Sequence, residues 1–339
     1  MQANRKVLII GPAWVGDMVM AQTLFTSIKK NEPNTQIDVV APSWSGPLLA
    51  RMPEIDDFYT LKVPHNKLQL SVRYQLAKQL RSKNYDQAIL LPNSFKSALL
   101  PLWAKIPIRT GWRGEFRYGL VNDMRILDKS LYPLMIERFM ALAYPKGAPL
   151  PRPYPNPKLI ADKISQQKSV EKFNLKIDKK PILALCPGAE FGPAKRWPVD
   201  YYAEVAAMAL AANWQVWLFG SKNDMPLAAK IQQFANNQCD DLVGETSLAQ
   251  AIDLLAMVNA VVTNDSGLMH IAAALQRPQV VVYGSTSPKF TPPLADNIKL
   301  IQRDLDCQPC FERTCPLEHM RCLTDIQPKE VYNAVLELI

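Results

Sequence analysis

The sequence lacks any long hydrophobic run. No apolar stretch approaches the roughly 20 residues that a membrane-spanning helix needs, and the amino end has only a short apolar stretch before Gly11 and Pro12. The sequence therefore predicts neither a spanning helix nor a signal peptide, and a protein that works in the cytoplasm.

Signs of disorder, of a collagen repeat and of a coiled coil are absent as well. Of the 339 residues, 48% are hydrophobic and 21% are charged, which is typical of a soluble globular enzyme. At about 100–200 residues per domain, the length predicts two domains. Each would bury roughly two-thirds of the surface that its unfolded chain exposes.

The net charge of +8 conceals an asymmetry between the two halves. Residues 1–170 contain 24 basic and 12 acidic side chains, a net charge of +12, whereas residues 171–339 contain 15 and 19, a net charge of −4. A positive surface attracts polyanions such as nucleic acid, anionic lipid headgroups and phosphorylated glycolipids. Charge alone does not choose among them, and a solvated basic surface without a partner is an equal alternative.

A proline-rich segment, residues 145–157, predicts a linker, because its six prolines exclude both a helix interior and a central strand. On each side of it, short β-branched runs alternate with longer stretches of helical period, the pattern of βαβ units in a parallel sheet. This predicts an α/β fold with two doubly wound domains, 1–157 and 158–325, that face each other across a cleft. The expected strands are residues 7–10, 36–41, 58–63, 87–92, 108–112, 181–188, 214–220, 260–265 and 279–284.

Open parallel sheets bind ligands beyond the carboxyl ends of their strands, where the strand order reverses, and three strand-to-helix turns meet this condition. In the first, GPAWVGD, Gly11 and Gly16 bracket a tight loop and Asp17 opens a helix. Asp17 is expected to cap that helix, to accept a proton from an incoming hydroxyl group, or to do both.

The second turn, CPGAEFGPAKRWP, contains Gly188 and Gly192 and then Lys195, shortly before Pro198 at an expected helix start. A lysine at this place meets phosphate as a point charge. The pattern is neither a Walker loop nor GxGxxG, and a surface loop with solvated bases is the alternative.

In the third turn, TNDSGLMHIAAAL, Asp265 or Ser266 can cap a helix, and Gly267 leaves room above its first amides. Those amides form a site for a diphosphate. His270 lies on the same helix face as Ser266 and is expected either near that site or in the core. Two phosphate-compatible turns opposite a carboxylate suit transfer from a nucleotide-activated donor.

A cysteine cluster near the carboxyl end has the spacing C-x2-C-x4-C-x3-H-x2-C, from Cys307 through His319 to Cys322. In a cytosolic protein such clustering favours a metal over disulfides. One interpretation is a structural zinc ion on Cys307, Cys310, Cys315 and Cys322. Reduced or opportunistically oxidised thiols are the other.

Residues 93–120 interleave basic and aromatic side chains, which suits nucleic acid, stacking on sugars, or a basic face beside core aromatics. RNA-binding signatures are absent, so nucleic acid is the weaker option. The side chains are Lys96, Arg109, Arg113, Arg117, Phe95, Trp112, Phe116 and Tyr118.

Taken together, these motifs resemble the ADP-heptose–lipopolysaccharide heptosyltransferases in order and spacing, over essentially the whole chain. The stretches concerned are GPAWVGDMVMAQTLF, LPNSFKSALLP, RTGWRGEFRYGLVND, PGAEFGPAKRWP and NDSGLMHIAAAL. The resemblance implies a GT-B glycosyltransferase with two Rossmann-like domains, whose last helix, residues 326–339, braces the first domain.

The implied reaction is inverting transfer of L-glycero-D-manno-heptose from ADP-heptose to heptosyl-Kdo2-lipid A, in lipopolysaccharide core synthesis of Gram-negative bacteria. The enzyme would be cytoplasmic and peripheral to the anionic inner-membrane surface, and no cofactor is expected to be required. The alternatives are another acceptor within the family, a nucleotide-sugar epimerase, or a non-catalytic glycan-binding protein.

The resemblance also implies roles for individual residues. Asp17 matches the general base and Lys195 the lysine that stabilises the departing diphosphate. Where a relative has a carboxylate that holds the ribose, this chain has Lys222, so ribose contact is expected from Asp224 or from backbone. The predicted donor-binding set is Gly188, Lys195, Lys222, Thr246, Asp265, Ser266, Gly267 and His270, and the predicted acceptor-binding set is Lys96, Trp112, Arg113 and Arg117.

Overall fold

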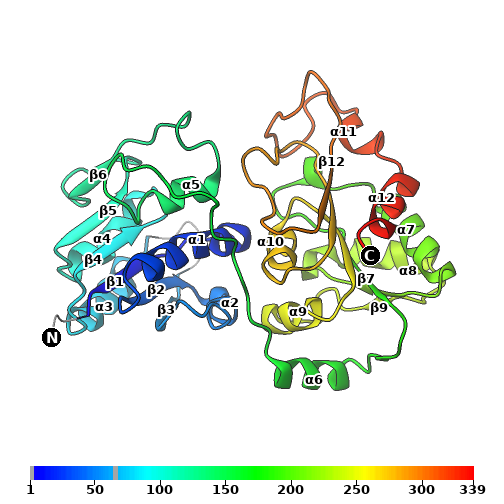
Figure 1. Ribbon diagram of the computed structural model, residues 1–339, viewed down its shortest axis with the longest axis horizontal. Helices are drawn as coiled ribbons and strands as arrows, with labels where there is room; N and C mark the ends of the chain where they lie inside the picture. The colour runs from blue at the N-terminus through cyan, green and yellow to red at the C-terminus, as the bar shows by residue number, and fades with distance from the viewer. Residues whose placement is uncertain (1–3, 64–67) are drawn as a thin grey trace. The chain divides into compact units, whose positions relative to one another are not determined.

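The computed structural model describes residues 4–63 and 68–339, and the chain divides into two units, residues 1–157 and 158–339 (Figure 1). In its described part, each unit contains one six-stranded parallel sheet with helices packed around it. The prediction of an α/β fold with two doubly wound parallel sheets is therefore confirmed.

The first unit builds its sheet in the order β3-β2-β1-β4-β5-β6. Its strands are β1 (Lys6–Ile10), β2 (Gln36–Pro42), β3 (Asp57–Leu61), β4 (Gln87–Leu90), β5 (Ile108–Trp112) and β6 (Asp123–Arg125). Its helices are α1 (Val15–Asn31), η1 (Ser43–Ser45), α2 (Gly46–Leu49), α3 (Leu70–Arg81), α4 (Phe95–Trp103) and α5 (Met135–Met140).

The second unit builds its sheet in the order β12-β11-β10-β7-β8-β9. Its strands are β7 (Ile182–Cys186), β8 (Gln215–Leu218), β9 (Asp240–Asp241), β10 (Ala260–Asn264), β11 (Gln279–Val282) and β12 (Ile298–Ile301). Its helices are α6 (Lys163–Lys172), η2 (Pro193–Lys195), α7 (Val199–Ala211), η3 (Lys222–Asp224), α8 (Met225–Phe234), α9 (Leu248–Leu255), α10 (Gly267–Ala274), α11 (Arg321–Thr324) and α12 (Pro328–Leu336).

Both sheets have the same topology. When the strands of each unit are numbered one to six along the chain, they lie side by side in the sheet in the order 3-2-1-4-5-6. The order thus reverses between β1 and β4 in one unit and between β7 and β10 in the other. Parallel pairing aligns Val7 with Gln87 and Leu183 with Ala260. The loops after these four strands therefore emerge at the switch points, where doubly wound sheets bind ligands.

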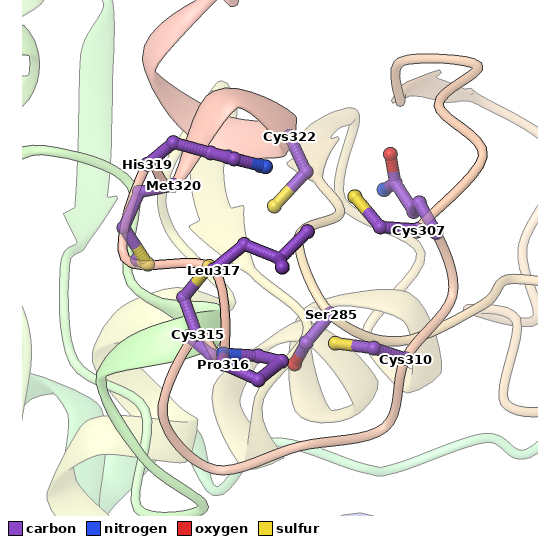
Figure 2. Close-up of a pocket in the computed structure, with 11 residues that line it drawn as sticks. Ser285, Cys307, Cys310, Cys315, Pro316, Leu317, His319, Met320 and Cys322 are labelled. Carbon is purple, nitrogen blue, oxygen red and sulfur yellow. The ribbon is translucent and has the colours of Figure 1, made fainter.

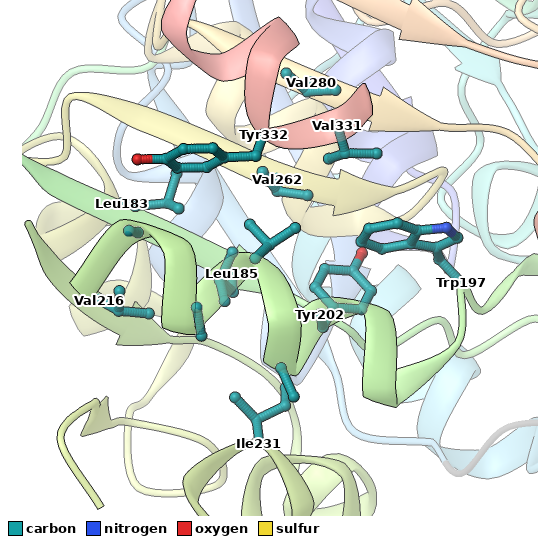
Figure 3. Close-up of a cluster of buried hydrophobic side chains, with 14 of the residues drawn as sticks. Leu183, Leu185, Trp197, Tyr202, Val216, Ile231, Val262, Val280, Val331 and Tyr332 are labelled. Carbon is teal, nitrogen blue, oxygen red and sulfur yellow. The ribbon is translucent and has the colours of Figure 1, made fainter. Parts of the chain in front are cut away.

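The core of the second unit explains why its strands are nearly continuous apolar runs. Every residue of β7 and of β10 is buried, as expected for strands of a parallel sheet that is covered on both faces. Figure 3 shows Leu185 and Val262 in one cluster with Trp197 and Tyr202, whose rings meet edge to face with centroids 5.0 Å apart.

The last helix, α12, lies on this same core; that it also braces the first domain stays a prediction. Its buried residues Val331, Tyr332 and Val335 belong to the hydrophobic cluster of the second unit (Figure 3). The Trp197 indole N–H also donates to the carbonyl oxygen of Ile326, just before α12, over 3.0 Å. Apolar side chains at helical spacing are thus buried within their own unit.

Several boundaries differ from the expected ones. Helix α1 begins at Val15 with Trp14 as its N-cap residue, so Asp17 lies in its first turn and is not the N-cap residue. The sequence pattern does not predict strands β6, β9 and β12. Strands β6 and β9 have only two or three residues and at most one apolar side chain, and β12 is too short, at four residues, to give a strand pattern. Residues 145–157 contain no helix or strand, and no helix of the described chain is long and apolar enough to cross a bilayer.

Candidate active site

A buried ion pair joins two of the predicted turns at the switch point of the second unit. Lys195, the last residue of η2, donates from Nζ to Asp265 Oδ2 over 2.6 Å. The same carboxylate oxygen accepts a hydrogen bond of 2.6 Å from Thr286 Oγ1. Only 14% of the Lys195 side chain and 4% of the Asp265 side chain are exposed. Tertiary structure thus pairs two charged residues that no local motif connects.

Asn264 fixes the turn that carries Lys195 to the end of β10. Its Oδ1 accepts from the backbone N–H of Trp197 over 3.0 Å, and its Nδ2 donates to the carbonyl oxygen of Pro187 over 2.8 Å. One fully buried amide thereby holds both ends of the loop between β7 and α7. The sequence motif contained Asn264 but gave no sign of this role, which depends on the neighbouring strand.

Helix α10 begins next to the ion pair. Ser266 is its N-cap residue, in extended conformation, but its hydroxyl lies 3.3 Å from Thr263 Oγ1 and does not cap the helix. The first amides of a helix have no partner within it, and they lie at the positive end of the helix dipole. With Gly267 as the first helical residue, this end of α10 suits a phosphate group.

His270 is buried one turn into α10. The pKa of its imidazole is lowered to about 4, mainly because the side chain is buried; the Asp265 charge opposes this shift and the Lys195 charge adds to it. The side chain is therefore uncharged at neutral pH. The charges of Asp265 and Lys195 both affect its pKa, so the neutral His270 side chain lies close to the ion pair.

Other predicted donor residues lie at the ends of neighbouring strands. Gly188 follows β7, and a Cβ atom there would lie 2.4 Å from Asp224 Oδ2, so only glycine fits. Asp224 is buried, and its Oδ2 accepts from the backbone N–H and the hydroxyl of Ser221, each over 2.8 Å. Lys222 is exposed on η3, and Thr246 donates to the carbonyl oxygen of Leu242 over 3.3 Å. These residues share one sheet edge with the ion pair.

In the first unit, Asp17 lies in the first turn of α1, just after the central strand β1, and is half-buried. Gly11 brings this helix close to the sheet, since a Cβ atom at residue 11 would lie 2.7 Å from Cε of Met18. The carboxylate is thus placed at the switch point of its own unit.

Two predicted acceptor residues, Trp112 and Arg117, are buried, and both donate hydrogen bonds to backbone carbonyl oxygens. The Trp112 indole N–H donates to the carbonyl oxygen of Arg138 over 2.9 Å. The fully buried Arg117 guanidinium donates to the carbonyl oxygens of Pro92, over 2.8 Å, and of Trp112. Burial lowers the pKa of Arg117. Arg117 thus joins the segment after β4 to the end of β5, and Trp112 joins β5 to α5.

Lys96 and Arg113 are the acceptor candidates that reach the surface, half-buried on α4 and exposed after β5 respectively. Beside them, Phe116 is 81% exposed, and its ring meets that of Tyr118 edge to face. Glu115 Oε2 accepts from the backbone N–H of Phe95 over 2.7 Å. This carboxylate thus occupies the first backbone amide of α4.

Comparison with known proteins identifies the family. A family model for glycosyltransferase family 9 (heptosyltransferase) matches residues 73–321. The chain is 46% identical to lipopolysaccharide heptosyltransferase 2 of Salmonella typhimurium, over 98% of each protein. This chain belongs to glycosyltransferase family 9. It is therefore a glycosyltransferase, as predicted, and no epimerase need be invoked.

Other relatives agree with this membership. The chain is 48% identical to lipooligosaccharide heptosyltransferase 2 of Haemophilus ducreyi, over 88% of each. It superposes on the structure of E. coli ADP-heptose lps heptosyltransferase II with a TM-score of 0.87, 45% identity and 98% coverage of both chains. E. coli heptosyltransferase WaaC with ADP shares the fold, with a TM-score of 0.71, 19% identity and coverage of 98% of this chain and all of that one.

The burial of Arg117 in this family 9 transferase predicts a structural role. Arg117→Ala should lower the free energy of unfolding by about 3 kcal/mol, because it leaves buried carbonyl oxygens without donors. Arg113→Ala removes the same charge from the surface and should change it by less than about 0.5 kcal/mol. Urea unfolding curves of the two variants measure the difference, and equal effects would contradict the assignment.

The low pKa of His270 predicts an acid-sensitive second unit. The folded pKa of about 4 lies below the ordinary value of 6.5, so the unfolded chain binds a proton that the folded chain excludes. Stability should therefore be lost as the pH falls from about 6.5 to 4, by about 3 kcal/mol in all. Urea unfolding at several pH values should show this loss in the native protein and not in His270→Gln; parallel curves would contradict it.

Proposed function

We propose that this family 9 enzyme transfers L-glycero-D-manno-heptose from ADP-heptose to heptosyl-Kdo2-lipid A, with inversion at the anomeric carbon, during synthesis of the lipopolysaccharide inner core. The names of the relatives that are 45–48% identical support this substrate class. The observation that carries it is the Lys195–Asp265 pair beside the amino-terminal end of α10. A diphosphate leaving group requires positive charge at this place.

In this proposal the diphosphate of the donor lies against the first amides of α10 and the Lys195 ammonium group. Preorganised donors aimed at developing negative charge are usually the largest single contribution to such a reaction. Lys195 and the helix end then supply the positive charge that a metal ion supplies in other transferases. No catalytic cation is needed.

Asp265 has two tasks in this arrangement. Before the donor binds, its carboxylate accepts a hydrogen bond of 2.6 Å from Lys195 Nζ and holds this group in place. The lysine side chain therefore loses little conformational entropy when the diphosphate binds. Thr286 holds the same carboxylate from the other side. When the diphosphate also contacts the Lys195 ammonium group, the Asp265 carboxylate can accept hydrogen bonds from heptose hydroxyl groups with its remaining lone pairs.

Asp17 is the proposed general base. The acceptor hydroxyl oxygen forms a bond to the anomeric carbon while its proton passes to the Asp17 carboxylate. The bond between that carbon and the diphosphate oxygen breaks, and its electron pair leaves with ADP. Base and leaving-group stabiliser thus belong to different units of the chain.

The acceptor would be held by the basic first half of the chain. Lys96 and Arg113 are the side chains proposed to meet its phosphate or carboxylate groups, because they reach the surface at the ends of β4 and β5. The charge of +12 on residues 1–170 would also favour peripheral attachment to the anionic cytoplasmic face of the inner membrane.

Replacement of the base tests the reaction directly. Asp17→Asn should lower acceptor-dependent ADP release by about 100-fold to 10,000-fold, because general-base assistance is lost, while ADP-heptose binding persists. Asp128→Asn, an exposed carboxylate of the same unit, is the control and should keep full turnover. Retained turnover in Asp17→Asn would exclude this base, and native turnover without acceptor would exclude transfer.

Replacement of the lysine tests the leaving-group role. Lys195→Gln should lower turnover by about 100-fold, the typical cost of one lost donor to a developing anion, and should weaken ADP binding. Lys230→Gln removes the same charge from the exposed face of α8 and should leave both unchanged. Calorimetric titration with ADP separates the effects on binding from those on the rate, and native-like values for Lys195→Gln would overturn its assignment.

A further inference from the structure

Residues 302–320 join β12 to α11 without a helix or strand, and they contact the turn that carries Lys195. The carbonyl oxygen of Arg313 accepts from the backbone N–H of Ala194 over 3.0 Å, and Ala194 precedes Lys195. A Cβ atom at Gly192 would lie 2.4 Å from this oxygen, so the glycine permits the close contact. Backbone groups therefore fix the position of Arg313 relative to the η2 turn.

The same residues also contact the loop after β11. The backbone N–H of Ser285 donates to the carbonyl oxygen of Ala194 over 3.1 Å, and that of Phe311 donates to the carbonyl oxygen of Ser285 over 2.7 Å. Figure 2 shows Ser285 with Cys310 and Cys315 in the lining of a cavity of about 20 Å³. A void of this size holds about one water molecule at most, so the three segments lie closely together.

The four clustered cysteines all line this cavity. In the described part of the chain, no three His, Cys, Asp or Glu side chains are placed to hold one metal ion. The zinc interpretation of the cluster therefore stays a prediction. What the structure shows is that these side chains lie around the same small cavity as Ala194 and Ser285.

The Arg313 side chain contacts the aromatic ring that Lys195 also contacts. Its guanidinium lies 5.3 Å from the centre of the Phe191 ring, and the Lys195 Nζ lies 5.0 Å from the same centre. The face of an aromatic ring attracts a cation, and here one ring attracts two. Phe191 thereby holds the Arg313 guanidinium near the ammonium group of the candidate active site.

Only one of these two cations has a carboxylate partner. Lys195 pairs with Asp265. Within residues 4–63 and 68–339, the exposed Arg313 guanidinium forms no ion pair and donates no hydrogen bond. Like charges near one ring repel each other, although this half of the chain, residues 171–339, has a net charge of −4. A second cation without a partner at this place favours an anionic ligand.

We propose that Arg313 is a second cationic ligand, beside Lys195, for the diphosphate group of the nucleotide donor. The inference rests on the proposed function for the identity of this ligand. A guanidinium group presents a planar fork of N–H donors that matches two phosphate oxygens, whereas an ammonium group acts as a point charge. Together the two side chains stabilise the negative charge that develops on the departing diphosphate.

Calorimetric titration with ADP tests this role. Arg313→Gln should weaken ADP binding by about 10-fold or more, because a charge-assisted hydrogen bond is lost. The variant keeps the contact with Ala194, which uses a backbone oxygen. Arg321→Gln is the control, because it removes the same charge from an exposed residue that pairs with Asp325, and it should keep the native affinity. Native-like ADP binding by Arg313→Gln rules the proposal out.

Adenosine separates a contact with the diphosphate from general damage to the site. It lacks the phosphate groups, so titration followed by nuclear magnetic resonance should give the same adenosine affinity for the native protein and for Arg313→Gln. An equal loss of affinity for adenosine and for ADP would mean that the substitution disturbs the whole site, which refutes the contact with the diphosphate.

Transfer assays distinguish failure of this inference from failure of the proposed function. If Arg313 binds the acceptor instead, Arg313→Gln raises the acceptor KM and leaves the ADP affinity unchanged, which contradicts the proposal. Weaker ADP binding by the variant, together with a native protein that transfers no heptose, counts against the proposed function alone. A native protein that binds no ADP contradicts both.

Discussion

The Lys195–Asp265 ion pair is the interaction on which the arrangement of the second unit depends. Removal of two charges from water costs several kcal/mol per ion, and such a pair persists only where further hydrogen bonds satisfy it. Thr286 provides one of these bonds, and Asn264 holds the loop that presents the lysine. The pair therefore gives little stability by itself. It places a cation at a fixed position beside a helix end, which a diphosphate can use.

Both units place their important residues by the same physical means. Parallel strands end at one edge of a sheet, so the loops that follow β1 and β4, or β7 and β10, meet at the switch points. In the second unit, the buried Asn264 side chain ties the loop after β7 to the end of β10 through backbone groups. In the first unit, the buried Arg117 side chain ties the segment after β4 to the end of β5. Polar side chains that bond to several backbone groups rigidify a site that loops alone would leave loose.

The carboxyl-terminal part of the chain supports the second unit in two places. Helix α12 covers the hydrophobic core with Val331 and Val335, and residues 302–320, between β12 and α11, meet the η2 turn through Arg313. A connection of this length without regular structure has few bonds of its own to hold it. Its hydrogen bonds to Ala194 and to Ser285 show that its order and the position of Lys195 are linked.

The sequence by itself determined the fold class, the positions of the longer strands and the turns that carry the site. These follow from local pattern, because apolar periodicity and turn glycines reflect the burial of each element by itself. Strand order, and with it the pairing of Lys195 with Asp265, was decided only in three dimensions. The burial of Trp112 and Arg117 was also decided only in three dimensions. The local sequence around an aromatic or basic side chain is the same whether that side chain contacts a ligand or backbone carbonyl groups. Likewise, the spacing of the cysteines indicates that their side chains lie near one another in the sequence, but only the folded segment decides how the thiols are placed around their cavity.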